Sequence, residues 1–290
     1  MSFLVGVVLL AVVTAVACAL PGTFMVLRRS SMLVDGISHA VLPGIVLGYF
    51  LTRNPDSPWL LLGAALSGLL VVLGSEYLTR TGLIAGDAPQ GLVFPALFSV
   101  GVILVSLEFS DVHLDTHTVL VGDLNLAGFR QLTVGGLDVG PAALYVMAGV
   151  AVLNGAFVWL FYPRLKLATF DPAFARSLGI PTGLLNTALM LLVAVTVTAA
   201  FNVAGAILVI ALMVVPAASA FLLTKRLSRM IAVTLVIAVG GSFAGFWLAY
   251  FLDAPTSAGM AVFQGIVFAA VFVATQSRRT VPVGGAAAAR

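Results

Sequence analysis

Long apolar stretches recur along the whole sequence, and they constrain the fold more than any other feature. They lie at about residues 3–20, 31–51, 58–74, 89–107, 141–161, 184–201, 203–223, 231–251 and 259–275. A helix needs about 17–25 mainly apolar residues to span a membrane, so each stretch is long enough. The sixth and seventh meet at Asn202 with almost no loop between them. We therefore predict an all-α polytopic membrane protein with eight or nine transmembrane helices.

The composition agrees with this prediction. Only 9% of the 290 residues are charged, and the mean hydropathy is +1.16. Soluble domains have about 25% charged residues, so this chain could not cover a water-facing surface. We predict one transmembrane domain over residues 1–278 and a flexible tail over 279–290. The single cysteine, Cys18, excludes an internal disulfide, and a net charge of +3 is no evidence for nucleic-acid binding.

The charges between the spans predict how the chain is oriented. If the N-terminus lies outside and the spans alternate, twelve arginines and lysines fall inside and only Arg53 and Arg130 fall outside. Basic residues concentrate on the cytoplasmic side of membrane proteins, so we expect the C-terminus to be cytoplasmic. Seven acids would lie outside. They would either attract cations or simply be tolerated there.

Two ionisable residues lie inside the second span, in the stretch SMLVDGISHAVLPGIVLGYF (residues 31–50). Asp35 and His39 are four residues apart, so they share one helix face. His39 follows Arg29 by ten residues, or about 15 Å of helix, which places it near the bilayer midplane. Ionisable groups are costly at that depth and usually indicate function.

The same stretch offers a third ligand. Pro43 has no N–H, so the carbonyl of His39 loses its helical partner. A carboxylate, an imidazole and a carbonyl suit a divalent transition metal such as manganese, zinc or iron. Two side chains are too few for a closed site, which suits a passing ion or a site completed by a second copy. A structural Asp–His pair and a proton relay are the alternatives.

A second group of potential ligands lies in the polar segment 108–140, which the orientation places outside. His113 and His117 alternate there with Asp111 and Asp115. On a helix the two histidines would align, and in an extended chain all four side chains would share one side. The segment could capture a cation, or it could be a solvated acidic loop that docks a partner.

The segment FDPAFARSLGIP (residues 170–181) predicts a short helix on the inner side. Asp171 is a good N-cap, Pro172 suits the first helical position, and Gly179 can end the helix. Such a helix could dock a soluble partner or simply connect two spans. The sequence has no phosphate-binding loop of the form G-x-x-x-x-G-K-[ST], so ATP-driven work would need a separate subunit.

The sequence resembles the permease subunit of ATP-binding-cassette importers for manganese, zinc and iron. The resemblance is carried by VLRRSSMLVDGISHAVLPGIVLGY, and it extends over about residues 1–275. The stretches DAPQGLVFPALFSVGVILVS, FDPAFARSLGI and GAILVIALMVVPAASAFLL are also similar to the family. This resemblance implies a transport subunit that is not an enzyme, lies in the bacterial plasma membrane and binds no permanent cofactor.

The resemblance also implies partners and residue roles. It implies a homodimer of this chain, two ATP-binding cassette subunits inside, and a metal-binding receptor outside. Asp35 and His39 match the family's metal-path residues, with manganese the favoured cargo. The segment that contacts the ATPase corresponds to Asp171, Pro172, Ala173, Arg176 and Gly179. In HLDTHT, Thr116 separates Asp115 from His117, which departs from the family pattern and weakens a ligand role there.

Three other functions fit parts of the sequence. A proton-coupled secondary transporter could use the aspartate and histidine as a relay. A siderophore- or vitamin-type permease would share the overall plan but would not need this pair. An intramembrane metalloenzyme would need more ligands and a general base, and the spans offer almost no other ionisable side chains.

Overall fold

The computed structural model describes residues 3–53, 57–84, 86, 88–108, 124–134 and 137–279. Eight helices in these ranges are long and apolar enough to cross a membrane. They are α1 (Phe3–Leu27), α2 (Met32–Thr52), α3 (Pro58–Arg80), α4 (Ala88–Glu108), α7 (Ala142–Phe170), α9 (Thr182–Leu223), α10 (Leu227–Phe251) and α11 (Thr256–Arg279). The predicted all-α polytopic fold is confirmed. Of the tail predicted over 279–290, Arg279 is the last residue of α11, and residues 280–290 lie outside the described residues.

The helix α9 contains a sharp break. It is 42 residues long, and an unbroken helix of that length would extend about 63 Å, twice the hydrocarbon core of a bilayer. Gly205 interrupts it with φ 77° and ψ 165°, a conformation essentially restricted to glycine. The spans predicted at 184–201 and 203–223 are the two arms of this broken helix. The predicted count of eight helices treats the two arms as one element, and the predicted count of nine treats them as two.

The second arm of α9 runs back beside the first. Asn186, near the start of α9, accepts a hydrogen bond from Arg28. Met213, in the second arm, packs its backbone directly against Gly22. Arg28 and Gly22 are six residues apart, or about 9 Å along a helix, whereas a straight α9 would carry Met213 about 40 Å from Asn186. The chain therefore reverses direction at Gly205, so α9 can cross the membrane twice.

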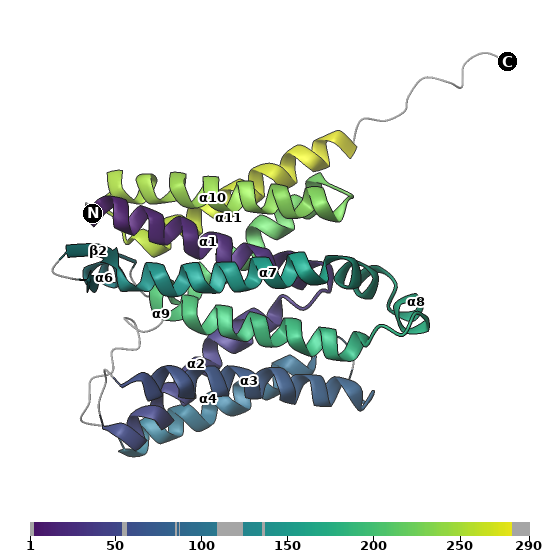
Figure 1. Cartoon of the computed structure of the whole chain (residues 1–290), viewed down its shortest axis with the longest axis horizontal. Helices are drawn as coiled ribbons and strands as arrows, with labels where there is room; N and C mark the ends of the chain where they lie inside the picture. Colours follow the sequence, from purple (N-terminus) through teal and green to yellow (C-terminus); the bar gives the residue numbers. More distant parts are fainter. Residues whose placement is uncertain are drawn as a thin grey trace, which may run out of the picture.

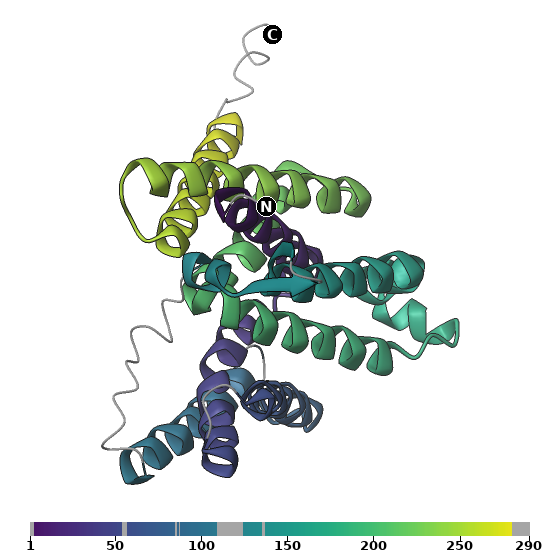
Figure 2. The same ribbon diagram turned by 60° about the vertical axis from the view of Figure 1, so that its left-hand side comes forward.

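The long helices form a bundle with distinct elements at its two ends (Figures 1 and 2). One end holds the N-terminus, the short helix α6 (Leu124–Phe129) and the strands β1 (Gln131–Val134) and β2 (Leu137–Pro141). The rings of Phe3 and Phe129 lie 4.8 Å apart there. The other end holds α8 (Pro172–Ser177) and the C-terminal end of α11.

The paired strands at the first end were not predicted from the sequence, which indicated only a polar segment there. The strands β1 and β2 are antiparallel, with Val134 opposite Leu137. Gly135 and Gly136 stand between them in the sequence, and this dipeptide is typical of tight hairpins. The strands are only four and five residues long, too short for a clear alternating pattern.

Glycines bring the helices close together at two interfaces. Gly44 of α2 faces Gly63 of α3, and each would clash with the other's backbone if it carried a Cβ. Gly241 and Gly245 of α10 face α11, where a Cβ on Gly245 would lie 2.9 Å from the Cα of Met260. Small residues at such contacts let helix backbones approach in membranes. These interfaces hold the bundle in register and position α2, which carries the candidate site.

Candidate functional site

The helix α2 brings Asp35 and His39 together on one face, as predicted. The Nε2 atom of His39 lies 3.4 Å from Oδ1 of Asp35. The side chains of His39 and Asp35 are 35% and 39% exposed in the single chain. Their neighbours Ile37 and Ser38 are buried, so the pair lies on the open side of the helix. A carboxylate and an imidazole are therefore accessible together within a membrane-spanning helix.

Two aromatic rings of α4 flank His39. The ring of Phe94 stacks against the imidazole with centroids 6.0 Å apart, and Phe98 meets it edge-on at 5.8 Å. These contacts restrict the rotation of the imidazole and hold it beside Asp35. Sequence reasoning missed both phenylalanines. Their i, i+4 spacing in the fourth span was visible, but nothing in the sequence paired that face with His39.

Pro43 lies one turn beyond His39 and packs against α4. Helix α2 continues from Met32 to Thr52 through this proline. Pro43 donates no hydrogen bond to the carbonyl of His39, so that oxygen remains available next to the imidazole. A Cβ on Gly101 of α4 would lie 2.8 Å from Cβ of Pro43, so the two backbones are in close contact. The role of this carbonyl as a third ligand stays a prediction.

The candidate site is incomplete within the part of the chain that the structure describes. No group of three or more His, Cys, Asp or Glu side chains comes together there. Asp35 and His39 therefore form an open pair rather than a closed cage. The other predicted ligands, His113, Asp115 and His117, lie outside the described residues.

The predicted inner helix forms with the expected caps. Helix α8 covers Pro172–Ser177, and the Asp171 carboxylate accepts a hydrogen bond of 2.9 Å from the N–H of Phe174. Gly179 has φ 76°, and the N–H of Ile180 donates to the carbonyl of Ala175 at 3.1 Å. These bonds satisfy groups that a short helix would otherwise leave open. The segment is therefore a preformed protrusion.

The surface of α8 is apolar at two positions that sequence reasoning missed. Phe174 is 51% exposed and Leu178 is 57% exposed, whereas Ala175 is buried against the bundle. Phe174 and Leu178 are spaced i, i+4, so they project on the same side. Ala173 and Arg176 are also exposed. The apolar i, i+4 spacing of Phe174 and Leu178 was visible in the sequence. Their exposure could not be predicted, because it depends on how α8 lies against α7 and α9.

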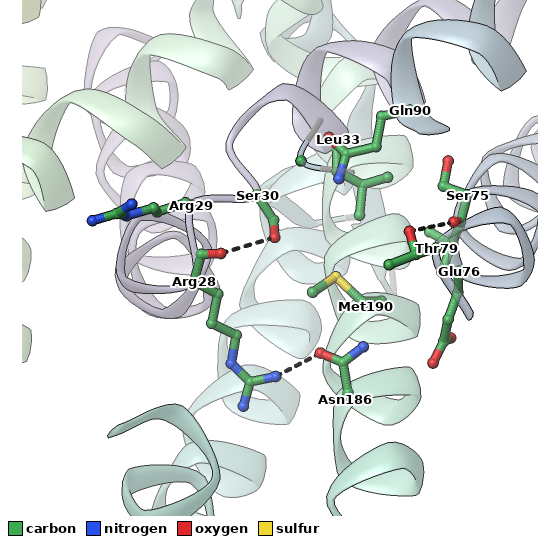
Figure 3. A pocket seen from close by; sticks show the side chains of 12 residues that line it. Arg28, Arg29, Ser30, Leu33, Ser75, Glu76, Thr79, Gln90, Asn186 and Met190 are labelled. Atoms are coloured by element: carbon green, nitrogen blue, oxygen red, sulfur yellow. Dashed lines mark hydrogen bonds between the residues drawn. The ribbon is translucent and has the colours of Figure 1, made fainter. Parts of the chain in front are cut away.

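A cavity of about 320 Å³ lies where α1 turns into α2 (Figure 3). Its wall includes Arg28 at the end of α1, Glu76 of α3 and Asn186 of α9. Burial lowers the pKa of the Arg28 guanidinium from its usual value, although an arginine remains charged under such conditions. Leu33, two residues before Asp35, also lines the cavity. This cavity was not predicted from the sequence.

Comparisons with known proteins agree with these features. The profile of the ABC 3 transport family matches residues 1–275. The zinc transport system membrane protein TroD of Treponema pallidum is 45% identical over 267 residues, which cover 92% of this chain and 72% of TroD. The manganese transport system membrane protein MntD of Bacillus subtilis is 38% identical over 273 residues, covering 94% and 92%. The solved structure of PsaBC from Streptococcus pneumoniae in complex with Fab has the same fold, with a TM-score of 0.76, 24% identity, and 97% and 95% coverage. The resemblance found in the sequence is thereby confirmed, and the chain belongs to the ABC 3 transport family.

Proposed function

We propose that this chain is the membrane permease subunit of an ATP-driven importer of a divalent transition metal ion. Manganese is the favoured cargo, and zinc and iron are the alternatives. The pair formed by Asp35 and His39 supports this proposal most directly, because a carboxylate and an imidazole 3.4 Å apart suit all three metals. The named relatives, a zinc and a manganese transport system protein, support it independently.

The open geometry of the pair suits transport better than storage. Two side chains and one carbonyl hold an ion weakly, and a weak site releases its cargo. A closed site with three or four protein ligands would retain the ion. The flanking Phe94 and Phe98 limit the motion of the imidazole without adding further ligands. Each ion would therefore stay briefly at His39 and Asp35 and then move on.

A second copy of the chain would complete the site. Asp35 and His39 are more than a third exposed, and such exposure to lipid would be costly. A dimer about a two-fold axis would cover this face and could bring the twin pair close enough to take over the ion as it moves on.

The helix α8 would couple the permease to ATP hydrolysis. The chain has no phosphate-binding loop of its own, so two copies of an ATP-binding cassette subunit would supply the energy. Phe174 and Leu178 offer an apolar anchor on a capped helix, which suits insertion into a groove on such a subunit. Asp171, Pro172 and Gly179 would fix the shape of this anchor.

The two ends of the bundle would face different compartments. The distribution of basic residues favours an extracellular N-terminus and a cytoplasmic C-terminus in a bacterial plasma membrane. The end with α6, β1 and β2 would then receive a metal-loaded receptor, and segment 108–140 with His113, Asp115 and His117 would belong to that face. The end with α8 would face the ATPases.

Uptake in proteoliposomes tests this function. The chain is reconstituted with its ATPase subunits and receptor, and uptake of radioactive manganese is measured with and without ATP and with competing zinc or iron. We expect manganese uptake that requires ATP. Whichever of zinc and iron the permease also carries should compete with manganese and lower its uptake. Uptake driven by a proton gradient without ATP would instead indicate a secondary transporter, and uptake only of a chelate would indicate a siderophore-type permease.

A further inference from the structure

One arginine side chain joins three helices at the α8 end of the bundle. Arg28 lies at the end of α1, and its Nη1 donates a hydrogen bond of 2.7 Å to Oδ1 of Asn186 at the start of α9 (Figure 3). Its Nε and Nη2 both donate to Oγ1 of Thr169, each at 3.2 Å. Thr169 is close to the end of α7, only two residues before the N-cap Asp171 of α8. The contact therefore links the base of α8 to α1.

The partners of Arg28 are neutral, so the contact depends on the direction of its hydrogen bonds and not on attraction between opposite charges. Among the described residues, no carboxylate lies within ion-pair distance of the Arg28 guanidinium. Hydrogen bonds with one charged partner are stronger than neutral ones. If Thr169 or Asn186 moved away, a half-buried cation would lose acceptors that water could only partly replace. The end of α7 and the end of α1 should therefore move together.

A second contact fastens the same part of α9 to α3. The Thr187 hydroxyl lies 3.0 and 2.9 Å from the two carboxylate oxygens of Glu76. Glu76 also accepts a hydrogen bond of 2.8 Å from Nη2 of Arg80. Thr187 follows Asn186 directly, so one point of α9 is connected to α1 on one side and to α3 on the other. A shift of α1 relative to this point would therefore have to stretch or break the hydrogen bond between Arg28 and Asn186.

The turn between α1 and α2 has room for such a shift. The cavity of about 320 Å³ borders Arg28, Ser30 and Leu33 (Figure 3). The turn itself is short and ordered, since the N–H of Ser30 donates to the carbonyl of Met25 at 3.0 Å. Asp35 follows Ser30 by five residues. A displacement of Arg28 would therefore be passed through a stiff turn to the start of α2 and its metal ligand.

We propose that Arg28 is a positioning residue that transmits the movement of α8 to Asp35 through Thr169. This inference rests on the proposed function, because it assigns a route by which ATP hydrolysis reaches the metal site. Hydrogen bonds connect Thr169 to Arg28, and the short ordered turn after Arg28 connects it to the start of α2. Arg28 itself does not touch the ion.

The test compares Arg28→Gln with Arg29→Gln in the complete complex in proteoliposomes. Arg29 is the neighbouring arginine and is exposed, so the control removes the same charge from the same turn. Metal transported per ATP, the ATPase rate and metal binding are measured. We expect Arg28→Gln to lower transport per ATP by about tenfold, equivalent to about 1.4 kcal/mol. ATP hydrolysis and metal binding should stay within about twofold of the wild type, and Arg29→Gln should behave as the wild type.

Two further variants separate positioning from charge and from folding. Arg28→Lys keeps the charge, but one ammonium group cannot reproduce the forked contact to Thr169 and Asn186, so transport per ATP should stay low. Thr169→Val keeps the shape and removes the acceptor, and it decides the question if Arg28→Gln fails to assemble. Normal transport per ATP in Thr169→Val, or full rescue by lysine, would overturn the inference. A wild-type complex without ATP-dependent uptake would instead overturn the proposed function.

Discussion

Replacing Gly44 by alanine should separate α2 from α3 and destabilise the protein. A Cβ on Gly44 would lie 2.7 Å from Cα of Ala64 and would clash with the carbonyl of Gly63. Ordinary contacts of a Cβ begin near 3.4 Å, and the Gly63 carbonyl is closer still than Ala64, so the two backbones must move apart by about 1 Å. Both neighbours are backbone groups, which cannot rotate out of the way as a side chain would.

The expected magnitude follows from two opposing effects. Adding a methyl group to a close-packed interface costs about 1–3 kcal/mol. Replacing glycine by alanine inside a helix gains about 0.5–1 kcal/mol. The net loss for Gly44→Ala should therefore centre on about 1 kcal/mol and not exceed about 2.5 kcal/mol, and 1 kcal/mol is a factor of about 5 in the folding equilibrium. Because Gly44 directly follows Pro43, the shift should also disturb the carbonyl of His39.

Thermal unfolding of the purified chain in detergent measures this effect. Gly149→Ala is the matched control, because a Cβ at Gly149 of α7 would meet nothing within 4 Å. We expect a lower unfolding midpoint for Gly44→Ala and an equal or higher midpoint for Gly149→Ala. If both variants were as stable as the wild type, the reasoning from backbone contact would be refuted.

Three further predictions concern other parts of the chain. Asn154→Leu should destabilise the bundle by about 1 kcal/mol in detergent, because the buried Asn154 amide donates to Thr196 at 2.9 Å and to an α1 carbonyl at 2.8 Å. An unchanged unfolding midpoint would contradict this. Gly205→Ala should cost about 1–3 kcal/mol by the same assay, since φ 77° with ψ 165° strains any residue that has a Cβ; a fully stable variant would show that the break does not depend on glycine. Phe174→Ser with Leu178→Ser should reduce copurification of the ATPase at least tenfold without changing the unfolding midpoint, and normal copurification would exclude α8 as the anchor.

The sequence predicted the helices well because membrane spans are coded locally. Runs of apolar residues with interrupting charges identify each span without knowledge of its neighbours. The caps of α8 were also local, so Asp171 and Gly179 could be placed from the sequence. The break in α9 was predicted near Asn202, three residues before its position at Gly205, because the apolar pattern continues through the turn.

Contacts between distant segments could not be predicted in the same way. Arg28 and Thr169 are 141 residues apart, and no local pattern links them. Phe94 and Phe98 read as ordinary apolar residues until α4 is packed beside His39. The pair of Asp35 and His39 was predictable because its members lie one turn apart on the same helix. How far the pair is exposed depended on the packing of the whole bundle.

The central claim is that Asp35 and His39 hold the ion during its passage. It is tested by metal uptake and metal binding of Asp35→Asn and His39→Gln in the complete reconstituted complex. Asp253→Asn serves as control, because Asp253 is a carboxylate just beyond the end of α10, a helix that packs against α1, α9 and α11. We predict that both site variants assemble normally but lose uptake to background and bind metal weakly, whereas the control transports normally. Wild-type uptake by both site variants would contradict the account.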